Sequence, residues 1–185
     1  MLYTIRNIIE SGNSSTIEFA DYKPMTVETD WVQNNELRPG KFIWIDDNGD
    51  MYKGLRVVCA AITKVKNGKR YLFAAQRGYG ALAGGWEFPG GKIEGDEDPK
   101  DAIVREIQEE LSTTIKVDKY IDTMEHSYKT LQFHISMDCF LCEVSAGKLT
   151  LNEHEDAKWL SKEDLFSVNW LPADLPLVKK IAAYL

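Results

Sequence analysis

The sequence predicts an α/β protein in which a mixed β-sheet lies between helices, preceded by a small β-rich extension. After residue 55, strand-like and helical segments interleave without a regular βαβ repeat. Before it, the chain contains only short strand-like runs. With 185 residues the chain is long enough for one full core and a small extra module. We therefore predict an extension over 1–54 and a main domain over 55–185.

The extension is predicted from three short runs with the composition of strands. They are LYTIRNII, TIEFADY and KFIWIDD, and Pro24 and Pro39 punctuate the segment. Trp31 and Trp44 are better explained as packing residues than as a platform for stacking bases. We expect the extension to pack on the main domain or to form a dimer contact.

The main domain is predicted to begin with a β-hairpin. LRVVCAAITKV is an apolar strand, Asn67-Gly68 is a hairpin turn, and RYLFAAQR returns as the partner strand. The glycine-rich loop GYGALAGG follows, and it either folds over a ligand or only connects two elements. Arg77, at the end of the second strand, is a candidate phosphate contact, with an ordinary surface arginine as the alternative.

Two further strands and two helices are predicted after residue 113. TIKVDKYIDTMEHSY and LQFHISMDCFLCEV are the strands. Ser161 with Asp164 predicts a capped helix over SKEDLF, and PADLPLVKKIAAYL predicts an amphipathic helix. Cys139 and Cys142 form a C-x-x-C pair inside a strand, where residues three apart point to opposite faces. We therefore predict that these cysteines pack in the core and do not bind zinc.

The stretch from Gly90 to Thr113, GGKIEGDEDPKDAIVREIQEELST, carries the strongest pattern in the chain. Asp98-Pro99 predicts a helix start, because aspartate caps free amides and proline suits the first helical position. Apolar residues then recur at helical spacing and predict a buried stripe. The stripe consists of Ala102, Ile103, Ile107 and Leu111.

Three glutamates lie on the same predicted helix. Glu106, Glu109 and Glu110 fall within an arc of about 100°. Carboxylates that close repel one another unless a cation lies between them. Oxygen ligands suit a hard ion such as Mg²⁺ or Mn²⁺. Taken alone, the heptapeptide REIQEEL (residues 105–111) would usually be a solvated helix face. The preceding glycine turn could bring backbone groups to a phosphate, which favours a metal site.

This stretch resembles the signature of the Nudix hydrolase family. That signature is a glycine, five residues, a glutamate, seven residues, and then Arg-Glu-apolar-x-Glu-Glu-x-Gly-apolar. The matching residues are Gly91, Glu97, Arg105, Glu106, Ile107, Glu109 and Glu110. Ser112 stands where the family has glycine, and Thr113 where it has an apolar residue. Both departures lie at the helix exit, so they bear on the local turn and not on the metal ligands.

The resemblance covers about residues 55–185 and implies an α/β/α sandwich. WEFPGGKIE is similar to the MutT-like branch, which hydrolyses nucleoside triphosphates to monophosphate and pyrophosphate. The sequence Pro172-Ala173-Asp174-Leu175-Pro176 resembles CTP pyrophosphohydrolase-like members, whereas MutT itself has asparagine where Asp174 falls. The resemblance therefore implies a nucleoside triphosphate pyrophosphohydrolase with a role in sanitising the nucleotide pool, acting on oxidised dGTP or on CTP and dCTP.

The resemblance also implies the roles of individual residues. The implied ligands of Mg²⁺ or Mn²⁺ are Glu106, Glu109, Glu110, the carbonyl of Gly90, and a further loop carboxylate, Glu153. The general base is either Glu106 or a loop glutamate, Glu153 or its neighbour Glu155. The catalytic set is Glu106, Glu109, Glu153 and Arg105. Arg105 is expected to pair with Glu97 and fix the loop against the helix, and Gly91 and Glu97 are structural. The candidates for contacting the nucleobase of the substrate are Phe88, Tyr128 and Asp174.

Composition and charge narrow the remaining possibilities. A net charge of −7 argues against a nucleic-acid surface, since such binding depends on neutralising phosphates. No signal peptide and no long apolar run is present, and three cysteines favour a reducing compartment. We expect a cytoplasmic monomer or homodimer that binds a nucleoside triphosphate, without nucleic-acid or membrane partners.

Two alternative functions remain open at this level. One is hydrolysis of another nucleoside diphosphate-linked substrate, such as ADP-ribose or a dinucleoside polyphosphate, for which Tyr128 is a loose indication. The other is a nucleotide-sensing module that binds without turnover, although the intact set of carboxylates argues against it.

Overall fold

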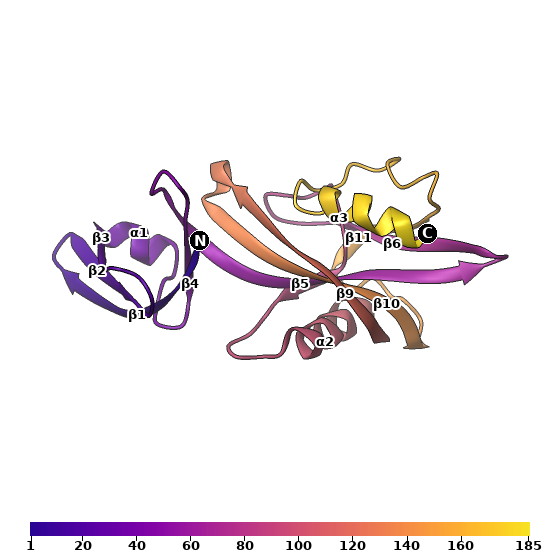
Figure 1. Ribbon diagram of the computed structural model, residues 1–185, viewed down its shortest axis with the longest axis horizontal. Coiled ribbons are helices and arrows are strands. Elements are labelled where there is room, and N and C mark those ends of the chain that lie inside the picture. Colours follow the sequence, from indigo (N-terminus) through magenta and orange to yellow (C-terminus); the bar gives the residue numbers. More distant parts are fainter. The chain divides into compact units, whose positions relative to one another are not determined.

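The computed structural model describes residues 1–185, and the chain divides into two compact units (Figure 1). The first unit consists of Met1–Leu55 and Ser127–Ile135, and the second of Arg56–His126 and Ser136–Leu185. The first unit thus contains the turn between two late strands in addition to the N-terminal residues. A functional division at residues 54 and 55 stays a prediction.

The first unit is built from four short strands, one short helix and the start of a longer strand. Its elements are β1 (Leu2–Ser11), β2 (Ser14–Phe19), β3 (Met25–Glu28), α1 (Thr29–Asn34) and β4 (Phe42–Ile45). β1 pairs antiparallel with both β2 and β4, β2 pairs with β3, and β4 pairs with the first residues of β5. The core is formed by Ile5, Ile17, Phe19, Val32, Leu37, Ile43 and Ile45.

The helix α1 has no counterpart in the sequence prediction. It is only six residues long, and its N-cap residue, Glu28, makes no side-chain capping hydrogen bond. A helix of this length depends on tertiary packing, here through Val32, and gives no periodic signal. Trp31 packs against the core of the unit, and Trp44 stacks on His134 with ring centroids 3.6 Å apart. Both contacts are packing contacts, as predicted.

The second unit contains the longer strands and the remaining helices. Its strands are β5 (Met51–Lys66), whose first residues belong to the first unit, β6 (Lys69–Arg77), β7 (Trp86–Glu87), β8 (Gly90–Lys92), β9 (Thr113–Tyr128), β10 (Phe133–Gly147) and β11 (His154–Leu160). Its helices are α2 (Pro99–Leu111) and α3 (Leu175–Ile181), and short 3₁₀ turns cover Lys129–Leu131 and Ala182–Tyr184. No helix in the structure is long and apolar enough to cross a membrane.

The predicted hairpin is present. β5 and β6 pair antiparallel, and both turn residues have positive φ, +52° at Asn67 and +75° at Gly68. Positive φ at both central positions is the requirement of the turn that matches strand twist. β6 also pairs with β11 and β7, and β5 with β8 and β10, so the hairpin is the centre of this sheet.

The central part of β5 is covered on both faces. Residues 58–63 are all buried, and since alternate residues of a strand face opposite sides, each face must be packed. Figure 1 shows α2 on one side of β5 and α3 on the other. The predicted fold class, an α/β/α sandwich, is confirmed.

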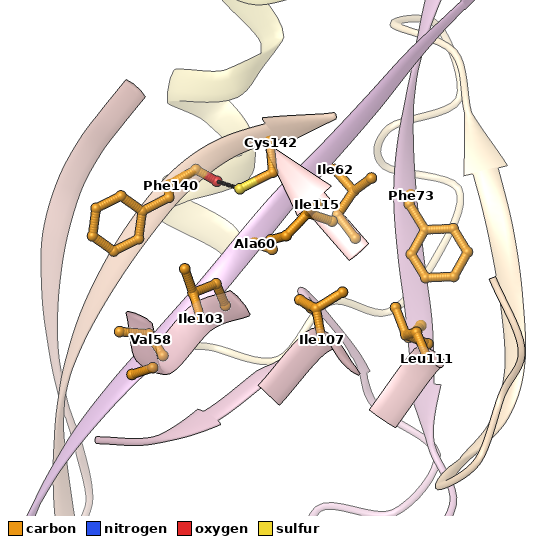
Figure 2. Packing of buried hydrophobic residues seen from close by; sticks show 12 residues of the cluster. Val58, Ala60, Ile62, Phe73, Ile103, Ile107, Leu111, Ile115, Phe140 and Cys142 are labelled. Carbon is orange, nitrogen blue, oxygen red and sulfur yellow. Dashed lines mark hydrogen bonds between the residues drawn. The ribbon is translucent and has the colours of Figure 1, made fainter. Parts of the chain in front are cut away.

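The core under α2 is formed by the apolar stripe of the helix and by side chains from four strands, β5, β6, β9 and β10 (Figure 2). Its main members are Val58, Ala60, Ile62, Phe73, Ala75, Ile103, Ile107, Leu111, Phe140 and Cys142. Cys139 is also fully buried, and all three cysteines are free thiols. The cysteines therefore pack in the core, as predicted.

The helix predicted over SKEDLF is wrong. Residues 161–167 form successive turns. The capping contact exists, because the Ser161 hydroxyl donates to Asp164 at 2.8 Å. However, the carbonyl of Leu165 accepts a hydrogen bond from the indole N–H of Trp170 at 2.6 Å, and Trp170 is buried. Burial of the indole group thus takes the chain away from a helical path that local capping favours.

We predict that Leu111→Ala destabilises the chain by about 2–5 kcal/mol, because it leaves a cavity between α2 and the sheet. Leu151→Ala is the matched control; Leu151 is 37% exposed, and its loss should cost less than about 0.5 kcal/mol. Urea unfolding of both variants measures the difference. Equal free energies of unfolding for the two variants would contradict the packing described here.

Candidate active site

The helix α2 separates an apolar stripe from a row of carboxylates. Asp98 caps it, accepting a hydrogen bond from the Lys100 N–H at 2.8 Å, and Pro99 occupies the first helical turn. This is the start predicted from the sequence. The stripe is buried against the sheet, and the glutamates are thereby held at its margin with their charges near the protein body.

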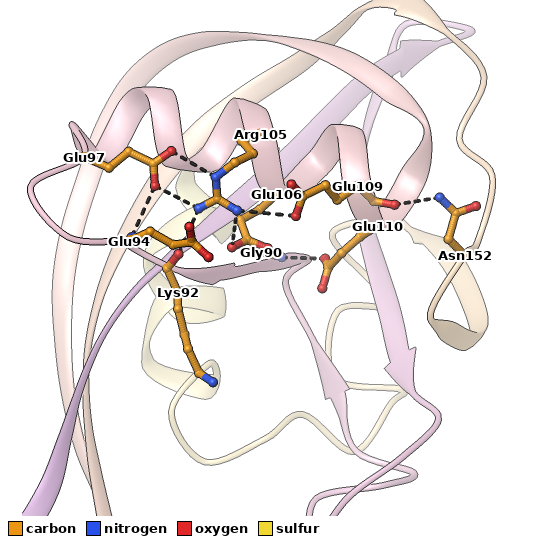
Figure 3. Close-up of polar contacts among 9 residues, drawn as sticks. All are labelled: Gly90, Lys92, Glu94, Glu97, Arg105, Glu106, Glu109, Glu110 and Asn152. Atoms are coloured by element: carbon orange, nitrogen blue, oxygen red, sulfur yellow. Dashed lines mark hydrogen bonds and ion pairs between the residues drawn. The ribbon is translucent and has the colours of Figure 1, made fainter. Parts of the chain in front are cut away.

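Arg105 is the centre of the polar contacts on this face (Figure 3). It forms a two-pronged ion pair with Glu97, with Nε and Nη2 donating at 2.9 and 2.8 Å. Its Nη1 donates to Glu106 at 2.8 Å and to Glu109 at 3.4 Å, and its Nη2 also reaches the carbonyl of Lys92 at 3.0 Å. The hydrogen bond to Glu97 and the neighbouring negative charges raise the pKa of Arg105. One guanidinium thus ties the loop before α2 to two of the three helix glutamates.

The glycine pair of β8 allows the helix to approach the sheet. Gly90 has φ of +151°, and a Cβ there would lie 2.1 Å from the carbonyl oxygen of Val58. A Cβ at Gly91 would lie 2.2 Å from Oε2 of Glu106. Only glycine leaves the space in which β8 fits between β5 and the Glu106 carboxylate.

Two of the helix carboxylates are held in surroundings that disfavour their charge. Burial raises the pKa of Glu110 to about 7, although the charge of His154 and a hydrogen bond from the Gly90 N–H at 2.9 Å oppose the rise. Burial also raises the pKa of Glu106, against the opposing effect of Arg105. Arg105 therefore does not compensate the whole negative charge of this face.

The donor set fits a hard divalent cation. Closely spaced carboxylates with raised pKa gain most from a positive ion, and oxygen ligands suit Mg²⁺ or Mn²⁺. No three acidic, histidine or cysteine side chains in the structure are gathered in a metal-holding arrangement. Instead Glu106 and Glu109 face Arg105, while Glu110 faces the backbone of Gly90.

The segment before β11 is anchored on the C-terminal end of α2. Asn152 donates from its side chain to the carbonyl of Glu109 at 2.6 Å and to the hydroxyl of Ser112 at 2.9 Å. The backbone N–H of Asn152 also donates to the carbonyl of Glu110 at 3.0 Å. These bonds hold the residue before Glu153 against the C-terminal end of α2. Nothing in the sequence pattern pointed to Asn152.

The helix exit keeps its turn despite the serine at the glycine position. Ser112 has φ of +50° and ψ of +38°, the left-handed conformation that glycine adopts most easily. Its N–H donates to the carbonyl of Gln108 at 3.1 Å. The departure from the family pattern therefore changes the residue and not the turn.

A second group of charges lies at the end of β6. Arg77 Nη1 donates to both carboxylate oxygens of Glu87, at 3.1 and 3.0 Å. Nε2 of His154 lies 3.4 Å from Glu87. Burial would lower the pKa of His154, but the contact with Glu87 and the charge of Glu110 raise it overall. Glu87, which the sequence prediction did not single out, thus joins two cationic side chains from separate strands.

The three candidates for contacting a base lie in different surroundings. Phe88 is buried, lies with its ring 5.0 Å from Trp170, and donates its N–H to Asp174 at 2.9 Å. Burial raises the pKa of Asp174 to about 8. Tyr128 belongs to the first unit, where its ring lies 4.8 Å from Phe133. The structure thus brings Phe88 and Asp174 together and assigns Tyr128 to the other unit.

Comparison with known proteins identifies this combination of fold and carboxylate-bearing helix. The NUDIX domain family matches residues 54–181. The chain is 32% identical over 141 residues to the CTP pyrophosphohydrolase of Escherichia coli, covering 71% of this chain and 93% of that enzyme. It is 31% identical over 122 residues to the Escherichia coli 8-oxo-dGTP diphosphatase, covering 65% and 93%.

A solved structure agrees with these matches. The solution structure of the MutT protein from methicillin-resistant Staphylococcus aureus 252 superposes with a TM-score of 0.58 at 38% identity, covering 72% of this chain and 99% of that one. The α/β/α fold with the glutamate-bearing helix α2, together with the family match and the named relatives, defines a hydrolase. The chain belongs to the Nudix family and is related to its MutT-like members.

We predict that Gly91→Ala lowers hydrolytic activity by about 100-fold, because the added methyl group displaces the Glu106 carboxylate. Gln108→Ala, at an exposed position of the same helix, is the control. Initial rates with circular dichroism of both variants separate a local effect from misfolding. Near-normal rates for Gly91→Ala would contradict the close approach.

We predict that Asp174→Asn flattens the dependence of stability on pH. The pKa of this carboxyl is raised from 3.8 to about 8, so between these values it is ionised in the unfolded chain and protonated in the folded one. The free energy of unfolding should therefore fall as pH rises, by up to about 1.4 kcal/mol per unit from this group. Urea unfolding between about pH 5 and about pH 8 measures the slope. Identical slopes for the variant and the unmodified chain would refute the assignment.

Proposed function

We propose that this protein is a Mg²⁺-dependent nucleoside triphosphate pyrophosphohydrolase, which releases pyrophosphate and leaves the nucleoside monophosphate. The observation that supports it most is the carboxylate face of α2, held against the glycine pair of β8 and only partly neutralised by Arg105. The named activities of its relatives, a CTP pyrophosphohydrolase and an 8-oxo-dGTP diphosphatase, supply the substrate class. Removal of damaged or unwanted nucleotides from the pool is the role that this activity serves.

The helix glutamates are proposed to hold the ion, either Mg²⁺ or Mn²⁺. The residues that would hold it are Glu106, Glu109, Glu110, Glu153 and, through its carbonyl, Gly90. A bound ion would supply charge neutralisation at the phosphates and would lower the pKa of water at the site. Glu110 is then favoured in its ionised form, because a nearby positive charge offsets the burial that raises its pKa.

Other side chains are proposed to orient the substrate. Arg105 fixes Glu106 and Glu109 relative to the loop that carries Glu97. Arg77 contacts a phosphate: only its Nη1 bonds Glu87, and a guanidinium carries five N–H donors. Asp174 and Phe88, which lie together, are the proposed base contacts within the second unit.

The general base is proposed to be either Glu106 or Glu153. Glu106 is paired with Arg105, whereas Glu153 accepts only the Tyr79 hydroxyl at 2.8 Å among the hydrogen bonds seen here. Replacing the base lowers kcat steeply and removes the acidic limb of the pH–rate profile. Replacing a ligand instead raises the Mg²⁺ concentration needed for activity. Comparing Glu106→Gln with Glu153→Gln by both measures assigns the role.

The proposed function predicts Mg²⁺-dependent pyrophosphate release from at least one nucleotide in a panel of all common ribo- and deoxynucleoside triphosphates plus 8-oxo-dGTP. Chelation with EDTA should abolish the release. Glu109→Gln and Glu110→Gln should each lower it by at least about 100-fold, because each removes a ligand. Glu163→Gln, which lies outside the site, is the control.

Full activity of both ligand variants would overturn the proposal. Silence across the panel, with phosphate monoesters released from ADP-ribose or a dinucleoside polyphosphate and little free pyrophosphate, would instead assign the same fold to another diphosphate substrate.

A further inference from the structure

Tyr79 lies at the start of the glycine-rich loop and joins two parts of the site. Its hydroxyl donates to Oε2 of Glu153 at 2.8 Å. Its ring lies against the guanidinium of Arg77, with the Cζ atom 5.1 Å from the ring centroid. A single side chain therefore contacts both the proposed phosphate contact and the proposed loop carboxylate.

The backbone beside Tyr79 is close to the same segment. A Cβ at Gly78 would lie 3.4 Å from the carbonyl oxygen of Glu153 and 3.4 Å from both N and Cβ of Glu155. His154 pairs with Arg77 in the antiparallel register of β11 and β6, which brings the two chain segments side by side. The contact between Tyr79 and Glu153 thus rests on strand pairing as well as on one hydrogen bond.

The Glu153 carboxylate has a single hydrogen-bond partner, the Tyr79 hydroxyl. Asn152 anchors the preceding residue to the end of α2, but the Glu153 side chain itself has the Tyr79 hydroxyl as its hydrogen-bond donor. Tyr79 is 52% exposed, so burial does not explain why an aromatic ring is held here. The hydroxyl and the ring are both used in polar contacts.

We propose that Tyr79 is a positioning residue, which orients the Glu153 carboxylate and couples it to the glycine-rich loop and to Arg77. This inference rests on the proposed function, because it gives Glu153 a part in the reaction.

Kinetics of a double-mutant cycle test the role of Tyr79. Tyr79→Phe keeps the ring and removes the hydroxyl, and we expect kcat to fall by at least about tenfold with little change in KM, as for loss of a hydrogen bond to a charged group. In a Glu153→Ala background, where no acceptor remains for the hydroxyl, the same substitution should have no further effect. Tyr120→Phe is the matched control, an exposed tyrosine whose hydroxyl contacts Thr123 of the same strand, β9, at 2.6 Å.

Amide hydrogen exchange of the metal-free protein gives a readout without turnover. Tyr79→Phe and Glu153→Ala should each speed exchange in peptides covering 78–85 and 150–155, and the double variant should do no more than either. Tyr120→Phe should leave both peptides unchanged.

The outcomes separate this inference from the proposed function. An undiminished kcat for Tyr79→Phe, or the same loss in the Glu153→Ala background, would overturn the positioning role. If the unmodified chain hydrolyses no substrate, the proposed function fails, and exchange alone decides whether Tyr79 holds Glu153: unchanged exchange in both variants overturns the contact.

Discussion

The close approach of β8 to its neighbours is the constraint on which the rest of the site depends. Gly90 lies against the backbone of β5, and Gly91 lies against the carboxylate of Glu106, in space that no other residue leaves free. Because β8 is pinned in this way, its N–H at Gly90 reaches Glu110 and its carbonyl at Lys92 reaches Arg105. The short strand β8 thus sets the distance between α2 and the sheet, and its backbone supplies hydrogen-bond partners for Glu110 and Arg105.

Charge on α2 is balanced only in part, and that imbalance connects fold to chemistry. Hydrophobic packing of one face of the helix draws the glutamates on the adjoining face towards the protein body. Arg105 pairs with Glu97 in the preceding loop and with Glu106 and Glu109 on the helix. Glu110 has no such partner, and burial raises its pKa to about 7. Packing of the apolar stripe therefore holds Glu106 and Glu110 where burial disfavours their charge, and a divalent cation would stabilise their ionised forms.

Loops from distant parts of the chain complete the arrangement around this helix. Asn152 binds the end of α2, and Glu87 joins Arg77 to His154. These contacts form between side chains that are between 10 and 74 residues apart, such as the 74 between Tyr79 and Glu153. Geometry of the site is thus decided by strand pairing, above all that of β6 with β11, which brings the two loops together.

The pair of Arg105 with Glu97 was expected from the family resemblance, whereas the sequence by itself determined the helix start at Asp98-Pro99, the buried stripe and the hairpin at Asn67-Gly68. Each follows from local backbone preferences or from helical spacing, which act over a few residues. It could not predict α1, the turns over 161–167, or the contacts of Asn152 and Glu87. Only the tertiary structure decided these, because burial of Val32 and of the Trp170 indole, and the pairing of remote strands, override local capping and periodicity.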